Sequence, residues 1–375
     1  MVKYLIVGSG LYGSVCAREL TDAGHNCFVI EKRNHIGGNC YSKYHESSGA
    51  HQHIYGPHIF HTNSKEIWDY VNQFAEFNHF VNRPKVNYKG KIYSFPLNLL
   101  TLNQIYGVQT PAEAEAKLKS LRNPIENPRN LEEWCISEIG QELYEIFIKG
   151  YTAKQWGRDP KELPASIIKR LPFRTEFNDN YFFDRYQGIP IGGYTQIFEK
   201  LLAGIKVELG VDFLKDKDDW IRKYDKIIYT GPIDAFFDYS EGVLEYRSLR
   251  FESEEHHVRD FQGNAIINFT EQSVPYTRIV EYKHFDLNLK QPTTFITREY
   301  PQKWKRGMTE FYPVNTDANQ DVYNQYRMLA EHSGLPVVFG GRLGQYRYYD
   351  MHQVIASALT KVKSLLGNKY EFSSI

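Results

Sequence analysis

Residues 2–31 read VKYLIVGSGLYGSVCARELTDAGHNCFVIE, and this stretch decides the fold. The apolar run at 2–7 predicts a short β-strand. The helical spacing of apolar residues at 11–23 predicts a helix, and a second apolar run at 27–30 predicts another strand. Strand, helix and strand in this order form a βαβ unit, which places two parallel strands side by side in a sheet.

Three glycines and one acid give this unit its expected chemistry. Gly8, Gly10 and Gly13 have G-x-G-x-x-G spacing between the first strand and the helix, and Glu31 directly follows the second strand. Gly8 permits a tight turn, Gly10 lets the backbone approach a pyrophosphate, and Gly13 lets the helix pack close to the strand. The pyrophosphate would lie at the positive helix N-terminus, and Glu31 would accept hydrogen bonds from ribose hydroxyls. The stretch therefore predicts a dinucleotide-binding unit.

Composition limits the classes of partner. The chain has 375 residues, which predicts two or three structural units. Lys plus Arg and Asp plus Glu are both 45, so no overall charge favours nucleic acid or an anionic membrane. Cys16, Cys27, Cys40 and Cys135 show no C-x-x-C spacing, which favours a reduced, cytoplasmic chain. With the first strand expected from residue 2 and no 18-residue apolar run, we expect no leader and no membrane span.

A histidine-rich segment raises the question of a metal. His51, His53, His58 and His61 lie close together in the sequence. No cysteine joins them and the helical HExxH pattern is absent, so we expect no metal site. The Gly-Pro pair before His58 predicts a turn that would place this histidine near the cofactor.

The rest of the chain changes pattern twice. Helical periodicity over 99–170 breaks the βαβ alternation and predicts a separate domain, whereas alternating strands over 243–300 predict an antiparallel sheet. The expected fold class is α/β, with a Rossmann-like dinucleotide-binding domain, an inserted helical domain and an antiparallel β-sheet domain. The expected boundaries are 1–81, 192–242 and 335–375 for the dinucleotide-binding domain, 98–191 for the helical domain, and 82–97 with 243–334 for the sheet domain. The irregular stretch at about 157–188 of the helical domain is expected to be a mobile lid or a linker.

The choice of FAD comes from a first resemblance. Residues 31–39 read EKRNHIGGN, a basic pair followed by a second Gly-rich turn. This segment resembles the extended FAD fingerprint shared by amine oxidases, GDP-dissociation inhibitors and related flavoproteins. NAD enzymes generally lack the second turn, so the resemblance favours FAD.

Longer motifs are similar to those of the bacterial UDP-galactopyranose mutases, essentially from end to end. The most specific are YGPHIFHT at 55–62, GYTAKQWGR at 150–158, FGGRL at 339–343 and YYDMHQV at 348–354. The resemblance implies interconversion of UDP-galactopyranose and UDP-galactofuranose. It also implies that N5 of reduced FAD attacks the anomeric carbon and forms a covalent flavin–sugar adduct. A homodimer is expected on the same ground.

The resemblance also assigns residues. Arg170 matches an arginine of the mobile lid and Arg278 a fixed one, and together they would hold the diphosphate bidentately as lysine cannot. With His58, which matches the histidine beside the flavin ring, they are the expected catalytic residues. The expected cofactor contacts are Gly8, Gly10, Tyr12, Gly13, Glu31, Lys32, Gly38, Asn39, Gly56, His58, Ile59, Arg342, Tyr349, Asp350 and Met351. The expected substrate contacts are Asn82, Phe147, Tyr151, Thr152, Trp156, Arg170, Tyr181, Arg247, Asn268, Arg278, Tyr312 and Tyr346.

Alternatives stay open at this point. The matched motifs do not recognise the C2 or C4 substituents of the sugar directly. UDP-N-acetylgalactosamine or another UDP-hexose is therefore also possible as the substrate. A flavin oxidoreductase of the amine-oxidase type shares the fingerprint but does not need paired arginines for a diphosphate. A binding protein on the GDP-dissociation-inhibitor fold has lost FAD, which Glu31 and the Gly38-Asn39 turn argue against.

Overall fold

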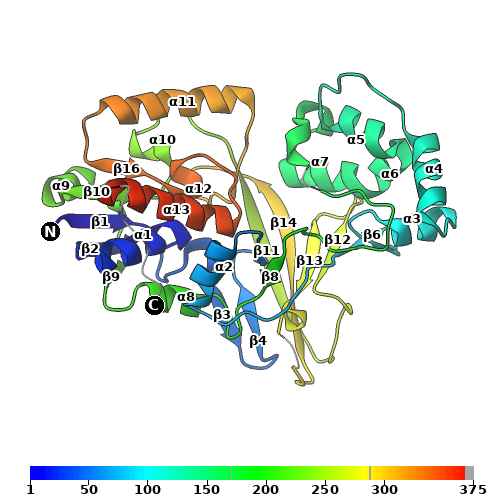
Figure 1. Ribbon diagram of the computed structural model, residues 1–375, viewed down its shortest axis with the longest axis horizontal. Helices are drawn as coiled ribbons and strands as arrows, with labels where there is room; N and C mark the ends of the chain where they lie inside the picture. Colours follow the sequence, from blue (N-terminus) through cyan, green and yellow to red (C-terminus); the bar gives the residue numbers. More distant parts are fainter. Residues whose placement is uncertain (170, 287–288, 368–375) are drawn as a thin grey trace.

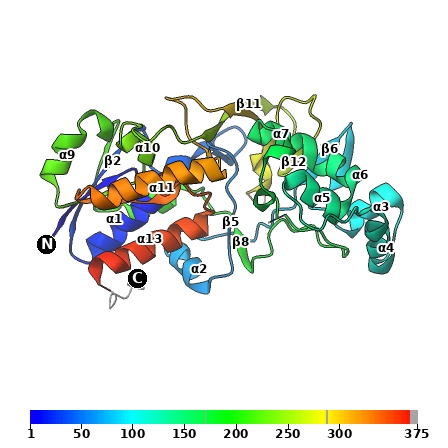
Figure 2. The ribbon, with the colours of Figure 1, turned by 90° about the horizontal axis from the view of Figure 1, so that it is seen from above.

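The chain forms two large sheets and a helical unit (Figure 1). The structure, a computed structural model, describes residues 1–169, 171–286 and 289–367. Figures 1 and 2 show the parallel sheet with its helices at one end of the molecule, the long antiparallel strands in the middle and helices α3–α7 at the other end. No helix in the described part has the length and apolar composition that crossing a bilayer requires.

The parallel sheet has the strand order β16-β10-β1-β2-β9. Apolar side chains of β1 alternate between two cores: Tyr4 and Ile6 face one side, whereas Leu5 and Val7 face the other. Helices cover both faces, as parallel sheets require. The strands are β1 (Lys3–Val7), β2 (Asn26–Glu31), β9 (Lys206–Leu209), β10 (Lys226–Tyr229) and β16 (Val337–Phe339). The helices are α1 (Leu11–Asp22), α2 (Lys65–Asn72), α8 (Thr195–Leu201) and α13 (Met351–Leu366) on one face, with α9 (Lys217–Lys223) and α10 (Ile233–Phe236) on the other.

The glycine turn is packed more tightly than any side chain allows. A Cβ atom at Gly13 would lie 2.0 Å from the carbonyl oxygen of Gly8, and Gly8 itself has a φ of +101°. A Cβ atom at Gly38 would lie 2.9 Å from the Cα of Gly10, so the two Gly-rich turns touch. These contacts confirm the close helix–strand packing predicted for Gly13.

The second sheet has the order β15-β11-β14-β13-β12-β6-β7, and its neighbours are antiparallel except for β12 and β6. Its register places Arg278 of β13 directly opposite Glu299 of β14. The strands are β6 (Lys85–Tyr88), β7 (Lys91–Ser94), β11 (Tyr246–His256), β12 (Ile266–Phe269), β13 (Arg278–Glu281), β14 (Thr294–Lys303) and β15 (Tyr312–Pro313).

The helical unit has a core of its own. Thr110 and Glu113 form a capping box around Pro111, the first residue of α4, where proline suits the first helical turn. The helices are α3 (Leu99–Tyr106), α4 (Pro111–Leu121), α5 (Leu131–Ile139), α6 (Gln141–Tyr144) and α7 (Gly150–Trp156), with one π-helical turn (Glu145–Lys149) before α7. Leu102, Leu118 and Leu131 are buried together between them.

Two contacts cross the expected domain boundaries. Strand β8 (Tyr186–Gly188) pairs with β5 (Phe60–Thr62), so the end of the expected helical domain contacts the α/β unit. Helix α11 (Asp317–His332) packs on α10, and its Tyr326 is also buried in one cluster with Tyr246 of β11. The three-part division otherwise stays a prediction, while the mixed α/β class with a Rossmann-like sheet is confirmed. The remaining elements are β3 (Ser42–His45), β4 (Ala50–His53), α12 (Gly341–Gly344) and the 3₁₀ turns at 38–40, 160–162, 165–167, 213–215 and 282–284.

Replacing Gly13 tests the glycine contact. Gly13→Val would push side-chain atoms into the Gly8 carbonyl, and we expect it to lower the free energy of unfolding by about 3 kcal/mol or more. The matched control is Gly24→Asn, because Gly24 has a φ of +83° with no atom within 4 Å of a built Cβ, and Asn tolerates this conformation. Urea unfolding followed by circular dichroism measures both. Equal stability of the two variants would contradict the packing described here.

Candidate active site

One cavity of about 1110 Å³ runs between the three parts of the molecule. Its wall combines the glycine turn of the α/β unit, strand residues of the antiparallel sheet and one face of α7. This volume exceeds the usual range for one small-molecule ligand, which is about 300–1,000 Å³. The cavity is therefore large enough to take a cofactor together with a substrate.

The α/β end of the cavity has the features of a dinucleotide site. Glu31 Oε2 accepts hydrogen bonds from the backbone nitrogen and the hydroxyl of Ser9, both at 2.9 Å, and Oε1 accepts one from the Arg33 nitrogen at 2.9 Å. These bonds hold the carboxylate at the cavity wall beside the glycine turn. The N-terminus of α1 opens into the same space, because Gly10 is its N-cap.

Buried polar atoms in this wall fit a polar ligand. Tyr12 Oη, Arg33 Nη1 and Arg342 Nε are buried and have no hydrogen-bond partner within the described chain, yet all three residues line the cavity. Buried polar groups are normally paired. A dinucleotide with phosphate, ribose and ring acceptors would supply partners, so the residues present fit a flavin dinucleotide.

His58 is held as a neutral imidazole at the centre of the wall. Its backbone nitrogen donates to His53 Nδ1 at 3.0 Å, and its own Nδ1 lies 2.8 Å from the Gly56 carbonyl oxygen. That carbonyl requires Nδ1 to carry the proton, which leaves Nε2 as an acceptor. Burial lowers the pKa of His58 to about 4, so the ring is uncharged at neutral pH.

Arg278 lies in the wall among tyrosines from three different elements. Its Nε donates to Glu299 Oε2 at 2.7 Å. Tyr151 comes from α7, Tyr312 from β15 and Tyr348 from the segment before α13, and the rings of Tyr312 and Tyr348 stack with centroids 5.4 Å apart. Burial raises the pKa of Tyr151 to about 12, so it stays a neutral donor. A guanidinium surrounded by neutral hydroxyls is suited to a phosphate-bearing anion.

Helix α7 brings the helical unit to this cation. Tyr151, Thr152 and Trp156 line the cavity from one face of α7, and Phe147 lines it from the preceding turn. The other face is bound to the sheet by Lys154, whose Nζ donates to the carbonyl oxygens of residues 269, 274 and 276 at 2.8, 2.9 and 2.9 Å. The position of the aromatic face relative to Arg278 is thus set by this contact.

The structure brings together nearly all of the residues predicted from the sequence. Every predicted cofactor residue lines the cavity, and so do Asn82, Phe147, Tyr151, Thr152, Trp156, Tyr181, Asn268, Arg278 and Tyr312. Arg170 lies outside the described residues. The contacts with ligand remain predictions for all of them.

Two predicted substrate residues do not reach the cavity wall. Arg247 donates from Nε to the Gln155 carbonyl oxygen at 2.8 Å, so it caps the end of α7. Tyr346 is 1% exposed and its hydroxyl donates to the carbonyl of Glu245. Tyr348, two residues later, lines the cavity instead. Both tyrosines belong to the run YRYY, and the sequence alone did not show which of the two lines the cavity.

The histidines of the segment 51–61 have partners other than a metal. His51 Nδ1 lies 3.4 Å from Asp286, His53 accepts from the His58 nitrogen, and His61 Nδ1 lies 2.7 Å from Asp184. Each ring is therefore positioned by a protein group.

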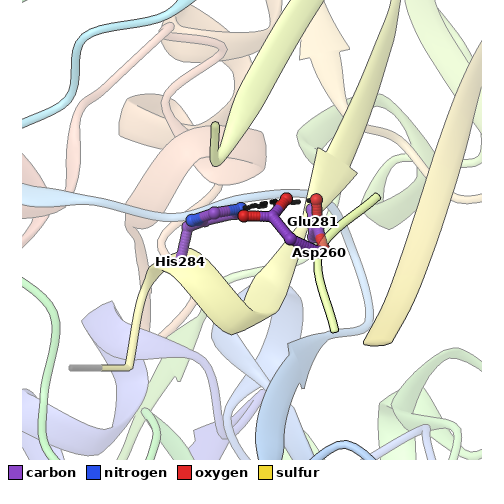
Figure 3. A group of neighbouring side chains, drawn as sticks. All are labelled: Asp260, Glu281 and His284. Atoms are coloured by element: carbon purple, nitrogen blue, oxygen red, sulfur yellow. Dashed lines mark hydrogen bonds and ion pairs between the residues drawn. The ribbon is translucent and has the colours of Figure 1, made fainter. Parts of the chain in front are cut away.

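One group elsewhere has the spacing of metal ligands: Asp260, Glu281 and His284 (Figure 3). Glu281 already accepts hydrogen bonds from the backbone nitrogens of Phe261 and Gln262 and from the Thr294 hydroxyl, and His284 Nε2 lies 3.4 Å away. These contacts lower the pKa of Glu281 to about 2 and raise that of His284. Both carboxylate oxygens of Glu281 therefore already accept hydrogen bonds from protein groups.

The sequence of this chain matches known protein families and their members. A family described as UDP-galactopyranose mutase matches residues 146–348, and a NAD(P)-binding Rossmann-like domain matches 6–74. A probable UDP-galactopyranose mutase of Klebsiella pneumoniae is 41% identical, over 97% of this chain and 94% of its own length. This chain belongs to the UDP-galactopyranose mutase family.

Other members and one solved structure extend the comparison. The dTDP-fucopyranose mutase of Escherichia coli is 38% identical, over 99% of this chain and 100% of its own length. A crystal structure of reduced UDP-galactopyranose mutase superimposes with a TM-score of 0.76 at 14% identity, covering 98% of this chain and 94% of that one. The family therefore includes mutases named for two different sugar nucleotides, and family membership alone leaves the substrate open.

The neutral state of His58 predicts a pH dependence. Its pKa falls from 6.5 to about 4 on folding, so the unfolded chain binds more protons between these values and the free energy of unfolding rises with pH across this window. His58→Gln should flatten that rise by roughly 1 to 3 kcal/mol. Exposed His257, changed to Gln, is the control. Parallel curves for wild type and His58→Gln from pH 4 to 7 would contradict a neutral buried His58.

Proposed function

We propose that this chain binds FAD and, with the flavin reduced, interconverts UDP-galactopyranose and UDP-galactofuranose. One observation carries the proposal: a single cavity joins the glycine cradle of the α/β unit to the Arg278–tyrosine cluster. A flavin ring lying beside His58 and a diphosphate lying on Arg278 would then share one cavity. Family membership supports the same reaction class.

The residues of this chain would bind and orient the substrate rather than donate a nucleophile. When bound and reduced, FAD supplies the nucleophile through its N5. Arg278 would compensate charge on the diphosphate as the anomeric bond breaks, so its contribution grows in the transition state. Burial keeps Tyr151 and Tyr312 neutral by raising the pKa of each hydroxyl, so they would donate hydrogen bonds without repelling the anion. Arg170 is proposed as a second diphosphate contact.

The enzyme is also proposed to be a cytoplasmic homodimer, which sequence composition and family resemblance favour. The predicted cofactor contacts, and the predicted substrate contacts that line the cavity, are part of the proposal.

A second substrate is favoured by one comparison. The relative from Escherichia coli is named for dTDP-fucopyranose, and this chain covers all of it. A 6-deoxy sugar on a thymidine nucleotide is therefore the second candidate. Steady-state kcat/KM for UDP-galactose and dTDP-fucose on the same preparation decides between them, and we expect the ratio to favour UDP-galactose.

Activity should require the reduced cofactor. Under argon, dithionite-treated protein incubated with UDP-galactofuranose should form UDP-galactopyranose, separable by chromatography, whereas the untreated preparation should form almost none. The reason is that the N5 lone pair is available for attack only in the reduced ring. Equal rates in both would contradict the reaction proposed, and net reduction or oxidation of the sugar would favour an oxidoreductase instead.

Arg278→Lys should separate bidentate anion binding from simple charge. Lysine keeps the charge but loses the planar fork, and a lost charge-assisted contact of about 1.5–3 kcal/mol corresponds to a fall of about 10- to 100-fold in kcat/KM. The matched control is Arg250→Lys on β11, where the guanidinium pairs with exposed Glu252. Flavin absorbance checks that cofactor binding survives. Similar kcat/KM for both variants would show that the diphosphate lies elsewhere.

A further inference from the structure

Glu299 is a buried carboxylate in the middle of the antiparallel sheet. It lies on β14, between β11 and β13, and its side chain is 1% exposed. The cross-strand register places it opposite Arg278, and the two side chains meet through a 2.7 Å hydrogen bond between Arg278 Nε and Glu299 Oε2. Arg278 itself lines the cavity, whereas Glu299 is not part of the wall.

The second carboxylate oxygen of Glu299 is unusual. Oε1 is buried and accepts no hydrogen bond from any described residue. A Cβ atom built on Gly56, a cavity residue, would lie 3.2 Å from it. An unpaired carboxylate oxygen in a protein interior is normally unfavourable. The carboxylate is thus kept just behind the cavity wall although only one of its oxygens is paired.

The geometry assigns different N–H donors of the Arg278 guanidinium to Glu299 and to a ligand. Arginine has five N–H donors in a planar fork, and the Nε donor is used by Glu299. The two Nη groups are then the donors available for a bidentate contact with a ligand in the cavity. A negative charge on the Glu299 carboxylate would also repel an anion bound to the same guanidinium, because like charges lie only a few bonds and one hydrogen bond apart.

We propose that Glu299 is a positioning residue that both fixes the fork of Arg278 and weakens its hold on the diphosphate of the sugar nucleotide. This inference rests on the proposed function. Both forms of the sugar nucleotide carry the same diphosphate, so affinity shared by substrate, transition state and product lowers KM without raising kcat. With part of its positive charge offset by Glu299, Arg278 orients the diphosphate while allowing the product to dissociate.

The variant Glu299→Gln removes the charge and tests the proposal. The proposal predicts tighter binding of UDP, whereas damage to the structure would weaken it. Glutamine keeps an oxygen that accepts from Arg278 Nε, and its amide occupies the space of Oε1. We expect the Kd for UDP, measured by isothermal titration calorimetry, to fall about tenfold because the repelling charge is gone. The Kd for uridine, which lacks phosphate, should not change.

Two further proteins complete the experiment. Glu252→Gln removes an exposed carboxylate from the neighbouring strand β11 and should leave UDP affinity unchanged. If Glu299→Gln does not fold, Glu299→Met, which keeps most of the volume without charge, gives the same test. Folding is judged by circular dichroism and bound flavin.

The results separate this inference from the proposed function. Unchanged or weaker UDP binding by a folded Glu299→Gln or Glu299→Met protein would overturn the role of Glu299. Tighter binding of uridine as well as UDP would also overturn it, since the effect would then not be one of charge. Failure of the wild-type protein to bind UDP would instead overturn the proposed function.

Discussion

The contact between α7 and the antiparallel sheet is the constraint on which the site depends. A Cβ atom at Gly150 would lie 2.1 Å from the Thr270 carbonyl oxygen, so the helix backbone rests directly on the sheet. Lys154 then uses its three ammonium donors on three carbonyl oxygens of the same β12–β13 connection, and Arg247 caps the far end of the helix. Lys154 is half-buried, and this burial lowers its pKa to about 8 because it disfavours the charged ammonium.

This docking makes one site out of three parts of the chain. The aromatic face of α7 is brought to Arg278 on the sheet, while Arg342 and Tyr348 approach from the α/β unit. The chain has no net charge, so a phosphate-bearing ligand must be attracted by such local cations. The buried tyrosines and His58 are neutral, so the positive charge near them lies, among the described residues, on the guanidiniums of Arg278 and Arg342. Glu299, which lies outside the cavity wall, offsets part of the charge of Arg278.

Local rules made much of this fold predictable. The glycine turn, the first strand, α4 from Pro111 and the closing helix at 351–366 follow from spacing and caps, because each depends on neighbouring residues. The docking residues carried no such signal. Lys154 and Glu299 look like ordinary surface charges in the sequence. The half-buried position of Lys154 and the buried position of Glu299 follow from a sheet that pairs strands far apart in the chain. For the same reason the resemblance to a family could not show that Arg247 and Tyr346 do not line the cavity.

The central claim is that cofactor and sugar nucleotide share one cavity. A crystal structure of the reduced protein with FAD and UDP bound tests it most directly. The account predicts the isoalloxazine ring beside His58 and the UDP diphosphate on the Nη groups of Arg278, both within this cavity, with Arg278 Nε still on Glu299. UDP bound outside the cavity, or a diphosphate that makes no contact with Arg278, would contradict it.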